Sequence, residues 1–193
     1  FRVQLSGTNL LEVFHVHLKC CTDCLGGTCA CPQRQSEAEK DATNITIWAS
    51  SNTIPYVFTG DCNEDEDHRD TPECTLTETY HPITTLVQGG GLVNYEPTTL
   101  SGQWKTWSTT SAQNVLDYVL AATNRLSAGT GYVFSSSDWA GNGKYTTEGA
   151  GNLSGDSQTA SDHYCVQVAY SFPTTVTNFN VTPAGAFSSS GPA

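Results

Sequence analysis

Oxygen-bearing side chains recur on alternate residues in one acidic segment of the chain. These residues are Asp61, Asn63, Asp65 and Asp67. Carboxylate and amide oxygens at this spacing can converge on Ca²⁺ in a tight loop. The segment departs from the usual calcium loop because Glu66 stands where the turn glycine is required. Two interpretations therefore stay open: a calcium site, or a solvated charged loop whose ends are tied by a disulfide bond. No other cofactor is expected.

The cysteines form a second constellation with chemical potential. They are Cys20, Cys21, Cys24, Cys29, Cys31, Cys62, Cys74 and Cys165. The N-terminal cluster, with His15 and His17 just upstream, also has spacings that fit a zinc site. A zinc module would use two pairs, whereas this cluster leaves one cysteine over. An even total favours disulfide bonds in an oxidising compartment. We expect Cys62 to pair with Cys74, and Cys165 to bind a cysteine of the cluster.

Other residues offer weaker catalytic patterns. Asp162 and His163, together with the many serines, permit a Ser/His/Asp triad, but no G-x-S-x-G motif accompanies them. Asp138 and Glu148 could form the paired carboxylates of a carbohydrate cleft. Phosphate-binding loops and dinucleotide fingerprints are missing from the sequence. We therefore assign no catalytic residue, and the sequence predicts a protein that is not an enzyme.

The composition restricts the partners and the compartment. A formal net charge of −11 disfavours binding to nucleic acid or to anionic lipid. No apolar run of about 20 residues occurs, so membrane insertion is not expected. The first residue is Phe1 rather than Met, which predicts removal of a signal peptide and a secreted or cell-surface protein. Three acceptor sequences predict N-linked glycans, although chance also produces such acceptors in a Ser/Thr-rich chain. They begin at Asn44, Asn152 and Asn180.

Alternation of apolar and polar residues predicts mainly strands. Phe1, Val3 and Leu5 share one face of the first strand, and a second strand follows over 11–20. Further strands are expected at 44–50, 53–59, 75–80, 83–88, 92–95, 103–107, 131–135, 162–172 and 174–181. A capping-box pattern predicts a short helix over 36–42. Apolar residues at helical spacing predict one amphipathic helix over about 111–127.

These elements predict a mainly β fold with one domain and an appendage. Residues 1–19 form an extended arm, and residues 20–193 form an antiparallel β-sandwich of Ig-like or jelly-roll-like type. Within the sandwich domain we expect a cysteine-rich segment at 20–31, the inserted helix at about 111–127, and an irregular tail at 184–193.

The leading functional hypothesis is a structural role. An apolar arm gains most by pairing with the edge of another sheet. The sequence therefore predicts a secreted glycoprotein that is the repeating subunit of a fibre, pilus-like filament or surface layer, with Phe1, Val3 and Leu5 joining the sheet of a neighbouring copy. The predicted partners are other copies of the chain, and also glycans. The alternatives are a carbohydrate-binding module, perhaps dependent on calcium, and a secreted hydrolase.

Overall fold

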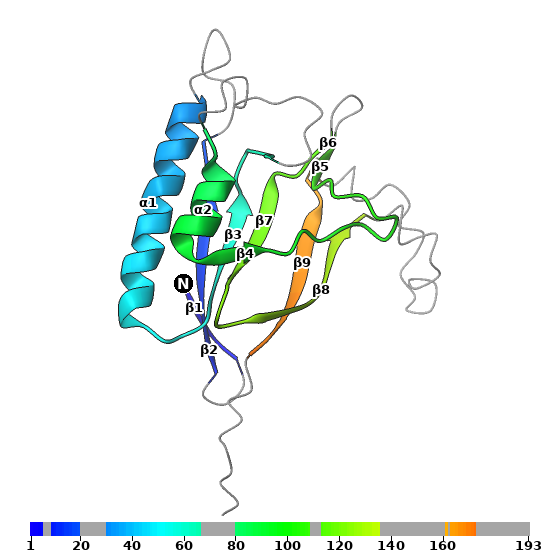
Figure 1. Cartoon of the computed structure of the whole chain (residues 1–193). Helices are drawn as coiled ribbons and strands as arrows, with labels where there is room; N and C mark the ends of the chain where they lie inside the picture. Colours follow the sequence, from blue (N-terminus) through cyan, green and yellow to red (C-terminus); the bar gives the residue numbers. More distant parts are fainter. Residues whose placement is uncertain are drawn as a thin grey trace, which may run out of the picture.

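A computed structural model of the chain shows an α/β fold built around a five-stranded mixed sheet (Figure 1). The residues that the structure describes are 1–5, 9–19, 30–66, 80–108, 113–135, 161 and 163–172. The strands of the central sheet, in spatial order, are β1 (Arg2–Gln4), β2 (Leu10–His17), β3 (Tyr56–Asp61), β7 (Asp117–Ala122) and β4 (Leu92–Asn94).

One pair of neighbouring strands in this sheet is parallel. β2 runs parallel to β3, while β1 pairs antiparallel with β2, and β7 pairs antiparallel with β3 and β4. A parallel pair requires a long crossover connection. The helix α1 (Ala30–Ser51) lies in that connection. Consequently β2 and β3 end at the same edge of the sheet.

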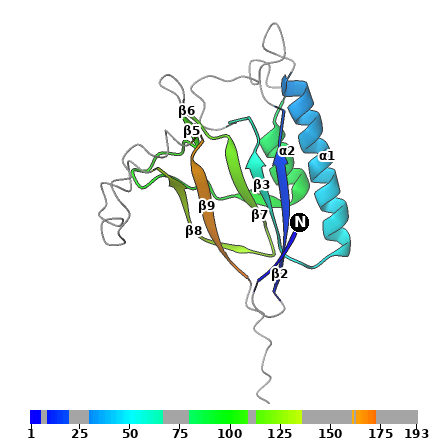
Figure 2. The ribbon, with the colours of Figure 1, turned by 180° about the vertical axis from the view of Figure 1, so that it is seen from behind.

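Two helices cover one face of the central sheet, and a two-stranded sheet lies against the other face. The helices are α1 and α2 (Pro82–Gly90). The second sheet pairs β8 (Ser127–Phe134) with β9 (Cys165–Ser171), and Figure 2 shows it from behind, with the helices on the far side. A short pair, β5 (Trp107–Ser108) and β6 (Gln113–Asn114), completes the described strands.

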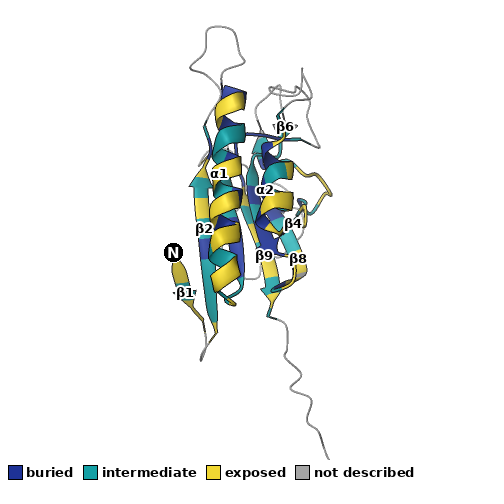
Figure 3. Ribbon diagram, turned by 60° about the vertical axis from the view of Figure 1, so that its left-hand side comes forward, coloured by how far each residue is buried: buried dark blue, intermediate teal, exposed yellow. Residues whose placement is uncertain are grey.

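The two faces of the central sheet contribute to separate hydrophobic clusters. Phe58 and Leu120 face the helices and are fully buried with Ile45 of α1 and Leu86 of α2. The opposite face packs in a smaller cluster, in which Tyr170 of β9 lies against the sheet. Figure 3 shows that α1 and α2 keep exposed residues on their outer sides. Apolar faces that meet in layers in this way account for the fold without a β-sandwich.

The predicted β-sandwich is wrong, and three local predictions contributed to the error. The helix expected at about 111–127 is absent, because β6 and β7 occupy this segment. Its apolar residues have helical spacing, but a strand that is buried on both faces produces the same short run. Conversely, residues 44–50 lie in α1, and 83–88 lie in α2. Both segments are rich in Ile and Thr, whose strand preference is overridden by tertiary packing.

The N-terminal arm pairs within its own chain. β1 registers Arg2 opposite Glu12, and the Arg2 guanidinium donates to the Glu12 carboxylate at 2.8 Å. The terminal ammonium group donates to the carbonyl oxygen of Val13 at 2.8 Å. Val3 therefore belongs to a strand of the chain's own sheet, and Phe1 and Leu5 flank this strand and also hydrogen-bond within the chain, to Val13 and Asn9.

The predicted cysteine pairings are also wrong where the structure describes them. Cys62 is a free, buried thiol and Cys165 is a free, exposed one, so neither makes the expected bridge. Cys31 is disulfide-bonded. The remaining cysteines lie outside the described residues: Cys20, Cys21, Cys24, Cys29 and Cys74.

The predicted glycan and membrane properties are tested only in part. Asn44 is exposed in α1, whereas Asn152 and Asn180 lie outside the described residues. Among the described helices, none is long and apolar enough to cross a bilayer.

Candidate metal centre

The register of the central sheet brings three polar side chains to one edge. The parallel pairing of β2 and β3 sets His17 opposite Asp61, the last residue of each strand. The antiparallel pairing of β3 and β7 sets Asp61 opposite Asp117, the first residue of β7. Since a polar side chain at a strand end need not pack into the core, this edge is a suitable place for a site.

His163 reaches this edge from the second sheet. It lies two residues before β9, where it forms an isolated bridge with Trp107. The N–H of the next residue, Tyr164, donates to the carbonyl oxygen of Thr106 at 2.6 Å. These backbone contacts fix the start of β9 beside the start of β7.

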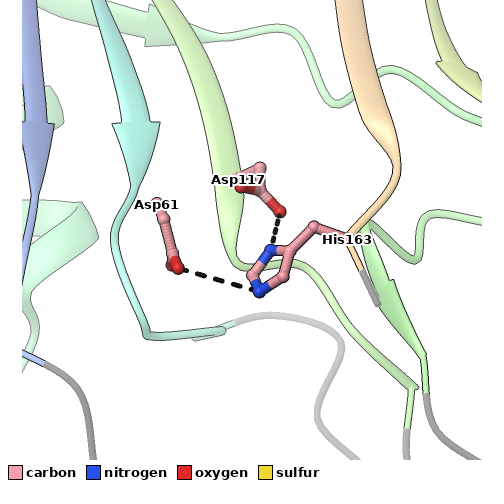
Figure 4. A group of neighbouring side chains, drawn as sticks. All are labelled: Asp61, Asp117 and His163. Atoms are coloured by element: carbon pink, nitrogen blue, oxygen red, sulfur yellow. Dashed lines mark hydrogen bonds and ion pairs between the residues drawn. The ribbon is translucent and has the colours of Figure 1, made fainter. Parts of the chain in front are cut away.

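His163 lies between the two carboxylates (Figure 4). Its Nδ1 is 2.8 Å from Oδ2 of Asp117, and its Nε2 is 3.9 Å from Oδ2 of Asp61. One ligand atom from each of the three residues lies within 4.8 Å of the others. The three residues thus form a group that can hold a metal ion, with oxygen and imidazole donors and partial exposure to solvent.

The charges at this edge favour a cation. Burial raises the pKa of Asp117 above its ordinary value, and the nearby Asp61 carboxylate raises it further. The hydrogen bond and charge of His163, and a hydrogen bond from Thr106, act in the opposite direction. Two carboxylates that repel each other in a partly buried site are stabilised by a positive charge between them. The donor set therefore fits a divalent metal ion.

A second imidazole, that of His17, lies close to the Asp61 carboxylate. Nε2 of His17 is 3.6 Å from Oδ2 of Asp61, and the His17 side chain is 68% exposed. His15, two residues earlier on β2, instead places its Nδ1 3.0 Å from the Thr59 hydroxyl. The two histidines that were considered together with the cysteine cluster thus contact different residues, and His17 is the one that lies near the metal-binding group.

The loop after β3 is held by buried polar contacts. The Arg34 guanidinium, on α1, donates to the Glu64 carboxylate at 2.6 Å, and both side chains are almost fully buried. The same guanidinium contacts the carbonyl oxygen of Asn63. The Asn63 side chain donates to the carbonyl oxygen of Leu18 at 3.1 Å. A buried pair of this kind depends on both partners, so α1 positions the chain immediately beyond Asp61.

The acidic loop is arranged differently from the calcium loop considered above. Asp61 belongs to the metal-binding group, but Asp65 is buried and accepts the backbone N–H of Val115 at 2.7 Å. Asn63 has a left-handed backbone, with φ of 51°, and its backbone N–H donates to the Asp61 carboxylate. Asp67 lies outside the described residues. The structure thus supports a metal-binding group, with one of the four expected ligands in it.

Sequence reasoning missed one member of this group and undervalued another. Asp117 was missed because its segment was interpreted as a helix. It is the first residue of β7, and a strand assignment would have placed it at an edge of the sheet. His163 was considered only for a serine triad. Asp138, Glu148 and Asp162 lie outside the described residues.

Comparison with known proteins identifies the fold. No protein-family model and no curated protein sequence matches the chain. The catalytic domain of human nocturnin, solved with a bound sulfate anion, has a TM-score of 0.52 and 15% identity, covering 86% of this chain and 49% of that domain. The chain thus spans about half the length of the domain it matches. At this identity the similarity shows the fold alone.

Two further structures are more distant. A mannosyl-6-phosphatase from Bacteroides thetaiotaomicron has a TM-score of 0.46 and 17% identity over 85% of this chain and 51% of that one. A Bacteroides thetaiotaomicron protein of the endonuclease/exonuclease/phosphatase family has a TM-score of 0.37 and 16% identity, over 65% and 39% of the two chains. These values are too low to support an argument. The nocturnin match defines the class of fold, which is an α/β fold similar to that of a catalytic domain.

The predicted structural role is therefore wrong, as is the prediction that the chain is not an enzyme. The fold is a mixed-sheet α/β fold, similar to that of the nocturnin catalytic domain, and is not an Ig-like sandwich. It gathers Asp61 of β3, Asp117 of β7 and His163, which precedes β9, into one group. Among the functions considered from the sequence, these findings favour the hydrolase.

Proposed function

We propose that the chain carries the metal-binding part of a phosphoester hydrolase. The observation that carries this proposal is the group formed by Asp61, Asp117 and His163 at the edge of the central sheet. A bound divalent cation would polarise a phosphoryl oxygen and lower the pKa of a coordinated water molecule. Carboxylate oxygens with one imidazole suit Mg²⁺ or Mn²⁺.

Each residue has a distinct task in this proposal. Asp117 accepts a hydrogen bond from Nδ1–H of His163, which leaves the lone pair on Nε2. That nitrogen lies toward Asp61, so these two side chains would hold the cation. A carboxylate that orients a ligating imidazole is a common arrangement in metal sites. Asp117 also adds negative charge beside the cation.

A tetrahedral anion is the group that the site would receive. The similar nocturnin domain was solved with sulfate, which has the shape and charge of a phosphoryl group. His17, exposed beside Asp61, can donate a hydrogen bond to such an anion. The net charge of −11 opposes long polyanions, so small phosphoesters are the favoured substrates.

The test separates binding from turnover. Calorimetry with MnCl₂ or MgCl₂ should show one site, which Asp61→Asn removes. Hydrolysis of p-nitrophenyl phosphate and its bis ester should fall by about 10²–10⁴-fold in His163→Asn. His15→Asn is the matched control, because His15 lies on β2 away from the group.

The proposal is wrong if neither ion binds the wild-type chain. It is also wrong if His163→Asn hydrolyses both esters as fast as His15→Asn does. Binding of Ca²⁺ alone, with no turnover, would support the carbohydrate-binding alternative in place of the hydrolase.

A further inference from the structure

The second sheet has an open edge at β9. Among the strands that the structure describes, β9 pairs with β8 alone. The outer edge of β8 is occupied by the segment after β4, because the N–H of Val133 donates to the carbonyl oxygen of Thr98 at 3.0 Å. No backbone hydrogen bond of the described residues reaches the outer edge of β9. Such an edge presents N–H and C=O groups that can pair with another strand.

The sequence of β9 leaves this edge unprotected. Natural proteins protect the edges of sheets with short strands, charged side chains or proline. The outer strands of the central sheet follow this rule, since β1 and β4 have three residues each and β1 carries Arg2. β9 has seven residues, Cys165–Ser171, and none of them is charged or a proline. It is therefore the described open edge that is best suited to accept a further strand.

The inner face of the second sheet is covered unevenly. Val133 of β8 is fully buried, whereas Val166, its partner on β9, is half-buried. Paired residues point to the same face of a sheet. The alternation along β9 places Tyr170, which packs against the central sheet, on this face as well. Val166 and Val168 thus point inward and still remain partly exposed. A neighbour on the open side of β9 would complete their burial.

The open edge of β9 faces β3 and β2. Nε2 of His163, just before β9, lies 3.9 Å from Oδ2 of Asp61 on β3, whereas β8 contacts the segment that follows β4. On this face of the central sheet Val13 packs in the smaller cluster, and the alternation along β2 gives His15 and His17 the same side. Both histidines are exposed. Figure 2 shows β8 and β9 on one side of the view and β2 on the other, so a strand beside β9 would lie over β3.

Three observations indicate what kind of partner fits this edge. Unpaired backbone groups are matched by an extended backbone, and the half-buried Val166 and Val168 are matched by apolar side chains on alternate residues. The formal net charge of −11 makes two copies of this chain repel each other, which favours a neutral or basic partner. The chain matches 49% of the nocturnin domain, so that domain includes about as much polypeptide again outside the matched part. A fold of this type thus accommodates further polypeptide around the same core.

From these features we propose that the open edge of β9 binds an extended polypeptide segment from outside residues 1–193. The segment is neutral or basic and carries apolar side chains on alternate residues. The added strand extends the second sheet over β3. Because β9 starts two residues after His163, one end of the added strand lies beside the candidate metal centre. This inference goes beyond the proposed function and does not depend on it.

The test uses a capped synthetic peptide of seven residues, the length of β9, in which valine and threonine alternate between terminal lysines. In NMR titrations the wild-type chain should bind this peptide, with shifted signals and slowed hydrogen exchange at the amides of Cys165–Ser171. In a second peptide, proline replaces the central valine and the threonine after it, so a donor is lost whichever edge of the peptide faces β9. This peptide should bind about tenfold more weakly.

Two variants with the same added charge locate the contact. Val166→Lys introduces a charge on the inner face, where the added strand would pack, and should weaken binding of the first peptide by about tenfold. Gln167→Lys is the matched control, because it places the charge on the exposed outer face of the neighbouring residue, and it should leave binding unchanged. Val166→Thr, which keeps the size of the side chain, should weaken binding in the same direction, and it replaces Val166→Lys if that variant does not fold.

Failure of the wild-type chain to bind the first peptide would overturn the inference, as would equal binding of the two peptides or shifts centred on β1 or β4. Sedimentation of the chain without peptide should show a monomer. A dimer that Val166→Lys dissociates would also overturn the inference, because a second copy would then occupy the edge. Metal titrations of the same samples keep the two proposals apart. A chain that binds Mn²⁺ but not the peptide retains the proposed function and loses this inference, and a chain that binds the peptide and no metal does the reverse.

Discussion

At the scale of single residues, burial disfavours the ionised form of Asp117, whereas its hydrogen bond to His163 favours that form. Its carboxylate is partly buried near Asp61, and burial is the largest cause of its raised pKa. It also accepts the hydrogen bond that orients His163. A side chain that is costly to ionise, yet is needed in ionised form, is typical of a site that binds a cation. The charge that destabilises the metal-free chain is the charge that would bind the metal.

The variant Asp117→Asn tests whether the charge of Asp117 destabilises the metal-free chain. Because the pKa of Asp117 is raised in the folded state, the native chain binds its proton more tightly than the unfolded chain does. The free energy of unfolding therefore falls as the pH rises above 3.8, the ordinary pKa of the group, because the carboxylate then ionises more readily in the unfolded chain than in the folded one. Without metal, Asp117→Asn should raise the melting temperature at pH 7 on the order of 2 °C and change it little at pH 3.

Thermal unfolding in a chelator at both pH values measures this difference. The amide still accepts the hydrogen bond from His163, so the comparison isolates the charge. A lower melting temperature for the variant at pH 7 would show that the carboxylate stabilises the metal-free fold.

At the scale of elements, the parallel pairing of β2 and β3 delivers His17 and Asp61 to one edge. The backbones approach closely at Gly60, whose φ is 143°. A Cβ atom at this position would lie 1.9 Å from the carbonyl oxygen of Val16 on β2. Only glycine fits such a backbone conformation and such an approach. Gly60 therefore allows the register that places its neighbour, Asp61, at the site.

Gly60→Ala should destabilise the chain by about 3 kcal/mol or more, since it combines backbone strain with a collision against main-chain atoms. Gly102→Ala is the matched control, because Gly102 also has a positive φ, of 83°, but has no atom within 4 Å of an added Cβ. Its cost should be about 1 kcal/mol. Urea unfolding measures both. Equal losses would mean that the close approach to β2 does not matter.

At the scale of the whole molecule, the candidate metal centre connects the two sheets. Asp61 and Asp117 come from the central sheet, whereas His163 precedes β9 of the second sheet. A cation held by Asp61 and His163, with Asp117 orienting the imidazole, would tie the sheets together at this edge. Since unfolding would separate the three residues, binding should stabilise the native fold as a whole.

Divalent cations should therefore raise the melting temperature of the chain. At a hundred times the dissociation constant, the gain is about 2.7 kcal/mol, or about 5–10 °C for a chain of this size. Excess chelator should reverse the shift, and Asp61→Asn should abolish it. Because the chain is acidic, NaCl at matched ionic strength is required as a control for screening. Equal melting temperatures in chelator and in millimolar Mn²⁺ would contradict specific binding.

Some predictions from the sequence are untested by the fold. Secretion, N-linked glycosylation and self-association remain predictions. Mass spectrometry of the natural protein would test the glycosylation directly. In the structure β1 pairs with β2 of the same chain, whereas the filament hypothesis required this strand to join the sheet of a neighbouring copy.

The sequence alone was sufficient for features that depend on local alternation. Strands were predicted where β1, β2 and β9 occur, because each has an alternating pattern of apolar and polar residues along its own length. The strand predicted at 53–59 also overlaps β3, although β3 begins with three consecutive buried residues. The sequence failed for α2 and β7, and it predicted only residues 36–42 of α1 as a helix, because the neighbouring layers determine which faces of these elements are buried. Val119 and Leu120 fit a helix and a buried strand equally well until their partners are known.

The acidic segment from Asp61 to Asp67 also shows which features the sequence predicts and which depend on tertiary structure. Its composition suggested metal ligands, and one of its residues, Asp61, belongs to the group that can hold a metal ion. The other two members, Asp117 and His163, lie far along the chain, and their approach depends on which strands are neighbours and in what register. Spacing along the chain carries no information on that register, since it results from packing two helices and a second sheet against one mixed sheet. The sequence by itself determined the ligand types, and only the tertiary structure decided which of them meet.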